Sequence, residues 1–98
     1  MNEQELKIVA TIVTDQKNND FVYKELKTIV KQTLKEEGNI SYVLHRDLKN
    51  PFKYIILEHW KDQAAIDFHN NTTHFKDFGA AIKGKIEGID VSIIQTIF

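Results

Sequence analysis

The fold is decided by the stretch Tyr54–Phe78, which reads YIILEHWKDQAAIDFHNNTTHFKDF. It opens with an apolar run that leads to Glu58 and Trp60. After a charged turn it continues as a helical pattern that carries His69, with His74 five residues later. No other segment collects a carboxylate, three histidines and a tryptophan so closely. We therefore expect the polar groups of a functional site to come from this stretch.

The composition is that of one small globular domain. The chain has 98 residues, of which 42% are hydrophobic and 28% charged, and its net charge of -1 provides no basic footprint for nucleic acid. We expect a single domain over residues 1–98. The absence of cysteine excludes disulfides, a thiol nucleophile and cysteine-ligated metals. No signal-peptide pattern and no apolar run near the roughly 20 residues that span a membrane is present, so we expect a soluble cytoplasmic protein.

The first third of the chain predicts a strand followed by a helix. Leu6–Thr14 is β-branched and apolar on both faces, which is typical of a strand covered on both sides. Apolar residues at helical spacing predict a helix over Phe21–Glu37. We expect Asn19 or Asp20 to cap its start and Gly38 to end it in the left-handed conformation.

A hairpin comes next. Ile40–Leu48 and Phe52–Trp60 both show the alternation of strands, and the short turn at Pro51 between them indicates an antiparallel pair.

The second helical region is interrupted. Helices are predicted over Asp62–Asn70 and His74–Lys85, with Thr72 or Thr73 as the cap of the second piece. A last strand is predicted over Ile89–Phe98.

The resulting order, β-α-β-β-α-β, predicts a ferredoxin-like α+β fold with an antiparallel sheet. Helices must cover one sheet face, and the other face is too apolar to meet water. We therefore predict a homodimer in which two sheets pack face to face. The residues that form this second apolar face are Val9, Val13, Val43, Ile55 and Leu57.

The same stretch resembles the antibiotic biosynthesis monooxygenase family, especially its small quinol-monooxygenase and autoinducer-2-processing members. The family pattern places E-x-[YW]-x-D/S-x-x-A before a helix that ends in histidine, then a polar gap and H-[FY]. The matching residues are Glu58, Trp60, Asp62, Ala65, His69, His74 and Phe75, preceded by Gly38, Tyr42 and Pro51. The resemblance implies a dimeric α+β barrel with one pocket per subunit between sheet and helices. It also implies oxidation of phenols without metal, flavin or haem.

Haem-degrading relatives of that family carry an asparagine in the first strand, a tryptophan ending the third and an axial histidine in the last helix. Trp60 matches the tryptophan. Leu6–Thr14 contains no asparagine, however, and Gly79 stands about where the axial histidine belongs. We therefore expect no haem, and the resemblance implies that no other cofactor is needed.

Glu58 and two histidines are the candidate catalytic residues. Glu58 shares a strand face with apolar groups, which raises a carboxyl pKa and suits a general base or a substrate anchor. His69 lies near an apolar helix face, and His74 lies at a helix start, where the imidazolium is disfavoured. The alternatives are a carboxylate paired with a backbone N–H or a lysine, and histidines that serve packing alone. Glu58, His69 and His74 are also a recognised metal-ligand set, but their spacing and the resemblance lead us to expect no metal.

Trp60, Phe75 and Tyr54 are the candidate walls of a pocket for a flat substrate. Our first hypothesis is a cofactor-independent monooxygenase for a quinol or a related small electron-rich aromatic. A second is an enzyme for a small phosphorylated signalling molecule, with Arg46 and Lys53 as phosphate contacts. A third is a non-catalytic small-molecule-binding dimer, because a fold alone does not decide function.

Overall fold

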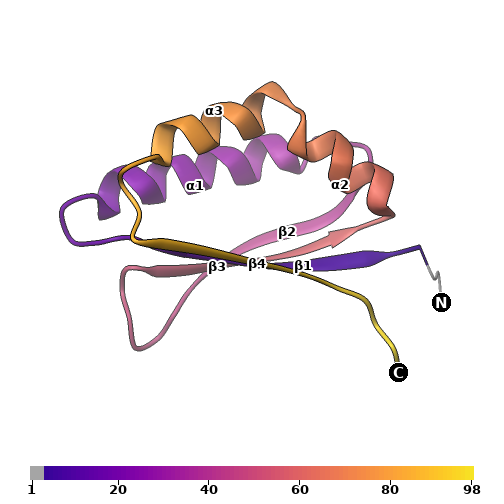
Figure 1. Cartoon of the computed structure of the whole chain (residues 1–98), viewed down its shortest axis with the longest axis horizontal. Coiled ribbons are helices and arrows are strands. Elements are labelled where there is room, and N and C mark those ends of the chain that lie inside the picture. Colours follow the sequence, from indigo (N-terminus) through magenta and orange to yellow (C-terminus); the bar gives the residue numbers. More distant parts are fainter. Residues whose placement is uncertain (1–3) are drawn as a thin grey trace.

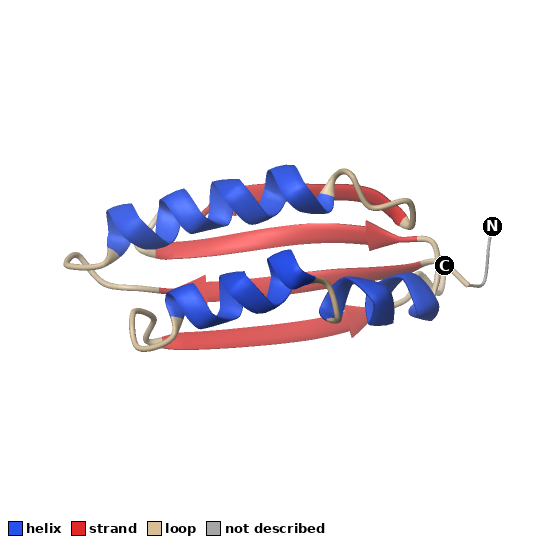
Figure 2. Cartoon of the chain, turned by 90° about the horizontal axis from the view of Figure 1, so that it is seen from above, coloured by secondary structure: helices blue, strands red, loops and turns tan. Residues whose placement is uncertain are grey.

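The computed structural model describes residues 4–98. Its elements, in chain order, are β1 (Leu6–Val13), α1 (Asn19–Thr33), β2 (Asn39–Arg46), β3 (Lys53–Trp60), α2 (Gln63–Asn70), α3 (Thr73–Ile82) and β4 (Gly88–Ile94). The helices all lie on one face of the sheet (Figure 1). Seen from above, α1 forms one row across the sheet, and α2 and α3 form a second row beside it (Figure 2).

The strands form one antiparallel sheet in the order β2-β3-β1-β4. This order confirms the predicted ferredoxin-like α+β fold, with its second helix divided into α2 and α3. None of the helices in residues 4–98 is long and apolar enough to cross a lipid bilayer.

The hydrophobic core lies between the sheet and the helices, as the two periodicities predict. The stripe Val22, Leu26 and Ile29 of α1 is buried. Alternate residues of the two central strands β1 and β3, including Ile12 and Ile56, are buried beneath the helices, whereas every residue of β4 is exposed. The opposite sheet face carries the predicted apolar side chains, and two of them, Val43 and Leu57, remain nearly half exposed at 49% and 44%.

Five elements end earlier than predicted; β1 ends at Val13 rather than 14 and β2 at Arg46 rather than 48. The first helix ends at Thr33 rather than 37, because the N–H groups of Lys35 and Glu36 turn back to the carbonyls of Gln32 and Thr33. The third helix ends at Ile82 rather than 85, since Gly84 takes a left-handed φ of 77°. The last strand ends at Ile94, and residues 95–98 leave the sheet on the side away from the helices (Figure 1).

One of the predicted helix caps is present and one is not. Thr72 caps α3, since its hydroxyl accepts a hydrogen bond from the N–H of Phe75 at 3.2 Å. The prediction of a cap at Asn19 or Asp20 was wrong. The N-cap of α1 is Asn18, without a side-chain cap bond, and Oδ1 of Asn19 instead accepts from the Tyr54 hydroxyl at 2.7 Å.

The prediction that Gly38 takes the left-handed conformation was also wrong. Gly84 is the glycine with positive φ among the described residues, and Gly38 has an ordinary negative φ. What Gly38 requires is space, because a Cβ there would overlap the Cβ of Ala65 in α2. The turn after α1 and helix α2 therefore touch directly at this point.

Candidate active site

A cavity of about 130 Å³ lies between α3 and the strands β1, β3 and β4. Its walls are mainly aliphatic and aromatic, and its polar lining comes from Tyr42, Glu58, His69 and Asn70. The first two of these belong to the sheet and the last two to α2. Two of the three predicted catalytic residues, Glu58 and His69, therefore meet at one apolar cavity.

Glu58 points toward the helices because side chains alternate along β3. Across the sheet it lies opposite Ile8 in β1 and Tyr42 in β2. Its Oε1 accepts a hydrogen bond from Nε1 of Trp60 at 2.9 Å. Burial raises the pKa of the Glu58 carboxyl to about 7, which the Trp60 hydrogen bond opposes and the nearby Glu36 reinforces.

His69 lies in the last turn of α2, and its side chain is only 3% exposed. Its ring packs against Trp60 and Phe75, with ring centroids 4.8 and 4.7 Å apart. Its Nδ1 lies 2.8 Å from Oε2 of Glu36. Burial lowers the pKa of His69, against the opposing effect of Glu36.

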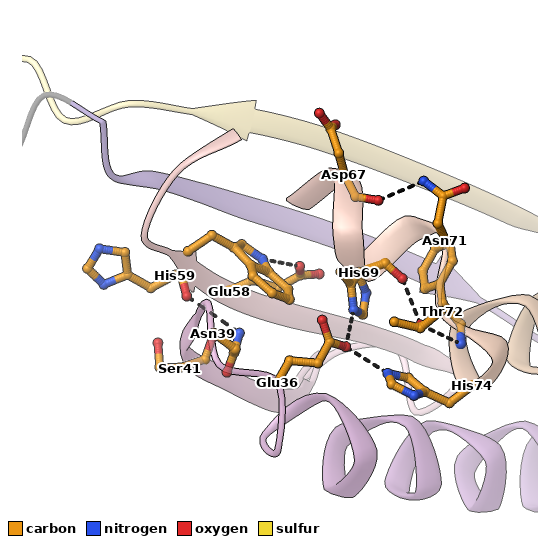
Figure 3. Close-up of polar contacts among 12 residues, drawn as sticks. Glu36, Asn39, Ser41, Glu58, His59, Asp67, His69, Asn71, Thr72 and His74 are labelled. Atoms are coloured by element: carbon orange, nitrogen blue, oxygen red, sulfur yellow. Dashed lines mark hydrogen bonds and ion pairs between the residues drawn. The ribbon is translucent and has the colours of Figure 1, made fainter. Parts of the chain in front are cut away.

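Glu36 is the site residue that sequence reasoning missed. It lies in the turn between α1 and β2, where its N–H donates to the carbonyl of Thr33 and its carbonyl accepts from the N–H of Asn39. Its buried Oε2 is shared by His69 and by Nε2 of His74, at 2.8 and 2.6 Å (Figure 3). In the sequence Glu36 stands among charged residues at a helix end, a pattern that indicates a solvated surface.

His74 takes its place from the junction of α2 and α3. The Thr72 hydroxyl donates to the carbonyl of His69 at 2.8 Å and caps α3, which leaves His74 in the first turn facing Glu36. His74 does not line the cavity of Glu58. It lines a larger groove of about 610 Å³ between the end of α1 and α2, together with Gly38 and Phe68.

The three predicted aromatic residues lie in different places. Phe75 lines the cavity. Trp60 is fully buried behind His69 and does not line it. Tyr54 is buried toward the other end of β3, where its hydroxyl donates to Asn19 and accepts from Nη2 of Arg46 at 3.3 Å.

Two polar groups line the same apolar cavity: the buried carboxyl of Glu58, whose pKa is raised, and the buried imidazole of His69. Because a carboxylate only accepts hydrogen bonds, we assign the protons of the shared bonds to Nδ1 of His69 and Nε2 of His74. Nε2 of His69 then carries a lone pair. This arrangement can accept a proton at His69 and hydrogen-bond a second polar atom at Glu58.

Comparison with known proteins identifies a family and relatives that are similar in sequence. The family model described as "Antibiotic biosynthesis monooxygenase" matches residues 6–81. "Putative monooxygenase YcnE" of Bacillus subtilis (strain 168) is 40% identical over 73 residues, 74% of each chain. "Probable quinol monooxygenase YgiN" of Escherichia coli (strain K12) is 28% identical over 100 residues, 92% of this chain and 96% of the relative.

A solved structure agrees over the whole length. The crystal structure of PA3566 from Pseudomonas aeruginosa superposes with a TM-score of 0.92 at 24% identity, covering 100% of this chain and 99% of the other. At that identity the likeness shows the fold alone. The family match extends from the first strand to α3 and includes Glu36, Glu58 and both histidines. The chain therefore belongs to the antibiotic biosynthesis monooxygenase family.

Proposed function

We propose that this protein is a cofactor-independent monooxygenase that oxidises a small, one-ring quinol in the cavity lined by Glu58 and His69. The observation that carries the proposal is the cavity itself: apolar walls, one imidazole and one carboxyl. Its volume of about 130 Å³ is close to the roughly 150 Å³ of an apolar protein cavity that binds benzene. A tricyclic flavin needs far more room than one aromatic ring, so substrate and flavin do not fit there together.

His69 is the proposed general base. Its Nδ1–H is held by Glu36, which directs the Nε2 lone pair away from Glu36 and stabilises the imidazolium that forms when Nε2 takes a phenolic proton. Because the pKa of His69 is lowered, its imidazole is neutral near pH 7. A neutral imidazole has a free lone pair and can accept the phenolic proton.

Glu58 is the proposed anchor for the second hydroxyl of the quinol. With a pKa of about 7, its carboxyl is present both as an acceptor and as a donor near neutral pH. Trp60 occupies Oε1, and no other described residue bonds to the Glu58 carboxyl, which leaves Oε2 available to the substrate.

The reaction balances without an external reductant. A quinol and O₂ give a hydroxyquinone and water, and the quinol supplies all four electrons that reduce O₂. Removal of the phenolic proton makes the ring electron-rich enough to pass the first electron to O₂, and the apolar walls shield the radical pair from water. The name of the relative YgiN, a probable quinol monooxygenase, supports this substrate class.

A phosphorylated substrate fits the cavity less well. No lysine or arginine is among the residues that line it within residues 4–98. Arg46, one of the two predicted phosphate contacts, lies over the rings of Tyr23 and Tyr54 instead.

The test is oxygen uptake by metal-stripped protein with hydroquinone, catechol and a naphthohydroquinone, corrected for uptake without protein. We expect uptake that is fastest with the one-ring substrates, and one ¹⁸O atom from ¹⁸O₂ in the quinone product. His69→Gln should lower the rate about 10²–10⁴-fold, and His45→Gln, a change at an exposed histidine outside the cavity, should not. Uptake no faster than the protein-free control with every quinol refutes the proposal.

The proposed enzyme is a homodimer whose open sheet faces pack together. The exposed apolar groups Val43 and Leu57 lie on that face, and the apolar residues Ile97 and Phe98 extend from it at 93% and 116% exposure. A second copy is the simplest cover for such a surface.

A further inference from the structure

The cluster of Glu36, His69 and His74 presents three metal-ligating side chains to one point. From the sequence we expected the two histidines to lie with Glu58, but in the structure both contact Glu36 (Figure 3). We propose that Glu36, His69 and His74 form a binding site for a divalent first-row transition ion of the zinc or iron(II) class.

The ligand atoms are already gathered. One carboxylate oxygen, Nδ1 of His69 and Nε2 of His74 all lie within 4.8 Å of one another. The two nitrogens are 2.8 and 2.6 Å from Oε2 of Glu36. Ligands about 2.1 Å from a tetrahedral ion stand roughly 3.4 Å apart, so the cluster must open by less than 1 Å on each of these two edges.

Each ligand comes from a different, well-anchored piece of backbone. Glu36 lies in a turn closed by two backbone hydrogen bonds, and His69 lies in the last turn of α2. His74 is held by the Thr72 cap of α3. The site is therefore preorganised, which reduces the entropy lost when an ion binds.

A second observation indicates that a water or an ion binds beside Glu36. Oε1 of Glu36 is buried and has no hydrogen-bond partner among the described residues. A buried carboxylate oxygen without a partner is costly, and such atoms in folded proteins call for a bound water or ion. An ion between the two imidazoles also reaches this oxygen if the carboxylate binds through both of its oxygens.

The donor set selects the class of ion. Two imidazole nitrogens and one carboxylate suit zinc, iron(II), cobalt(II) and nickel(II), whereas calcium and magnesium prefer oxygen ligands throughout. Three protein ligands leave a coordination position open for water or a small ligand. The groove of about 610 Å³ touches both Glu36 and His74, so an ion can enter from that side without crossing the apolar cavity.

An ion here would compete with the proposed base, and this consequence rests on the proposed function. Binding through Nδ1 of His69 shifts the ring proton to Nε2, the nitrogen that must accept the phenolic proton. Zinc is therefore expected to inhibit quinol oxidation, and chelation is expected to restore it.

The experiment is titration of chelator-treated, dialysed protein with Co²⁺ and Zn²⁺. We expect one equivalent of Co²⁺ to give visible ligand-field absorption that Zn²⁺ abolishes, with calorimetry confirming one zinc per chain. Glu36→Gln and the less buried His74→Gln should each weaken zinc binding about 100-fold or more. His59→Gln, on the other sheet face beside Glu5, should bind as the parent does, and circular dichroism checks the fold of each variant.

Metal binding is measured here without any assay of enzymatic activity, so the two proposals can fail separately. Absence of a cobalt band and of zinc heat in the parent overturns the metal site, as does unchanged affinity in a folded His74→Gln variant. One zinc bound per chain without loss of oxygen uptake supports the site and contradicts only the role of His69 as the base.

Discussion

Replacing Glu58 with glutamine should make the protein more stable at pH 8 and leave its stability unchanged at pH 4. Glutamine has nearly the same shape and keeps an oxygen for the Trp60 N–H, but it carries no charge into the cavity. In the unfolded chain the Glu58 carboxyl loses its proton near pH 4.5, whereas in the folded chain it keeps it up to about pH 7. Between these values the folded state binds the extra proton, so the free energy of unfolding falls as pH rises.

The size of the effect follows from this difference in pKa. Moving the pKa from 4.5 to about 7 corresponds to about 3 kcal/mol, at about 1.4 kcal/mol for each pH unit. Glu58→Gln should therefore match the parent below pH 4.5 and exceed its free energy of unfolding by about 3 kcal/mol above pH 7. With a urea m-value of about 1–3 kcal/mol/M, the midpoint should move by roughly 1–3 M.

The assay is urea unfolding at fixed protein concentration from pH 4 to 8, plotted as variant minus parent. The subtraction removes the opposite contribution of His69, whose lowered pKa favours folding as pH rises. Glu37→Gln, at a side chain that is 94% exposed, is the matched control for removing a carboxylate outside the cavity. A flat difference curve for Glu58→Gln would refute the protonated, buried carboxyl on which its proposed anchoring role depends.

Three further outcomes are expected. Gly38→Ala should lower the free energy of unfolding by about 1–3 kcal/mol, because its Cβ overlaps Ala65; urea unfolding at the parent's midpoint would contradict the contact. Thr72→Ala should cost about 1 kcal/mol through loss of the α3 cap while Thr72→Ser retains most of it, and equal losses in both variants would show that the hydroxyl is not responsible. Sedimentation at micromolar concentration should give twice the mass of one chain, and Leu57→Lys should shift it toward one chain; a parent that sediments as a single chain would rule out the homodimer.

The element order of this protein was readable from the sequence because its signals are local. A β-branched run such as Leu6–Val13, an apolar stripe at helical spacing and a threonine before a helix each act within a few residues. The same local alternation placed Glu58 on the helix-covered face of β3, since residues two apart along a strand point the same way. It also placed Tyr54 on that face, but alternation does not tell which residues of a strand share one cavity.

The tertiary structure alone decided which side chains meet. Glu36 is 33 residues from His69 and 38 from His74, and only the packing of α1 beside the α2–α3 junction brings the three together. Gly38 likewise takes its meaning from Ala65, a residue that no short-range pattern connects to it. Local periodicity depends on backbone geometry within one element. Contacts between elements depend instead on sheet register and helix packing, to which many distant residues contribute. The sequence therefore determined which groups were available for a site, and the packing of the helices on the sheet determined the partners of each.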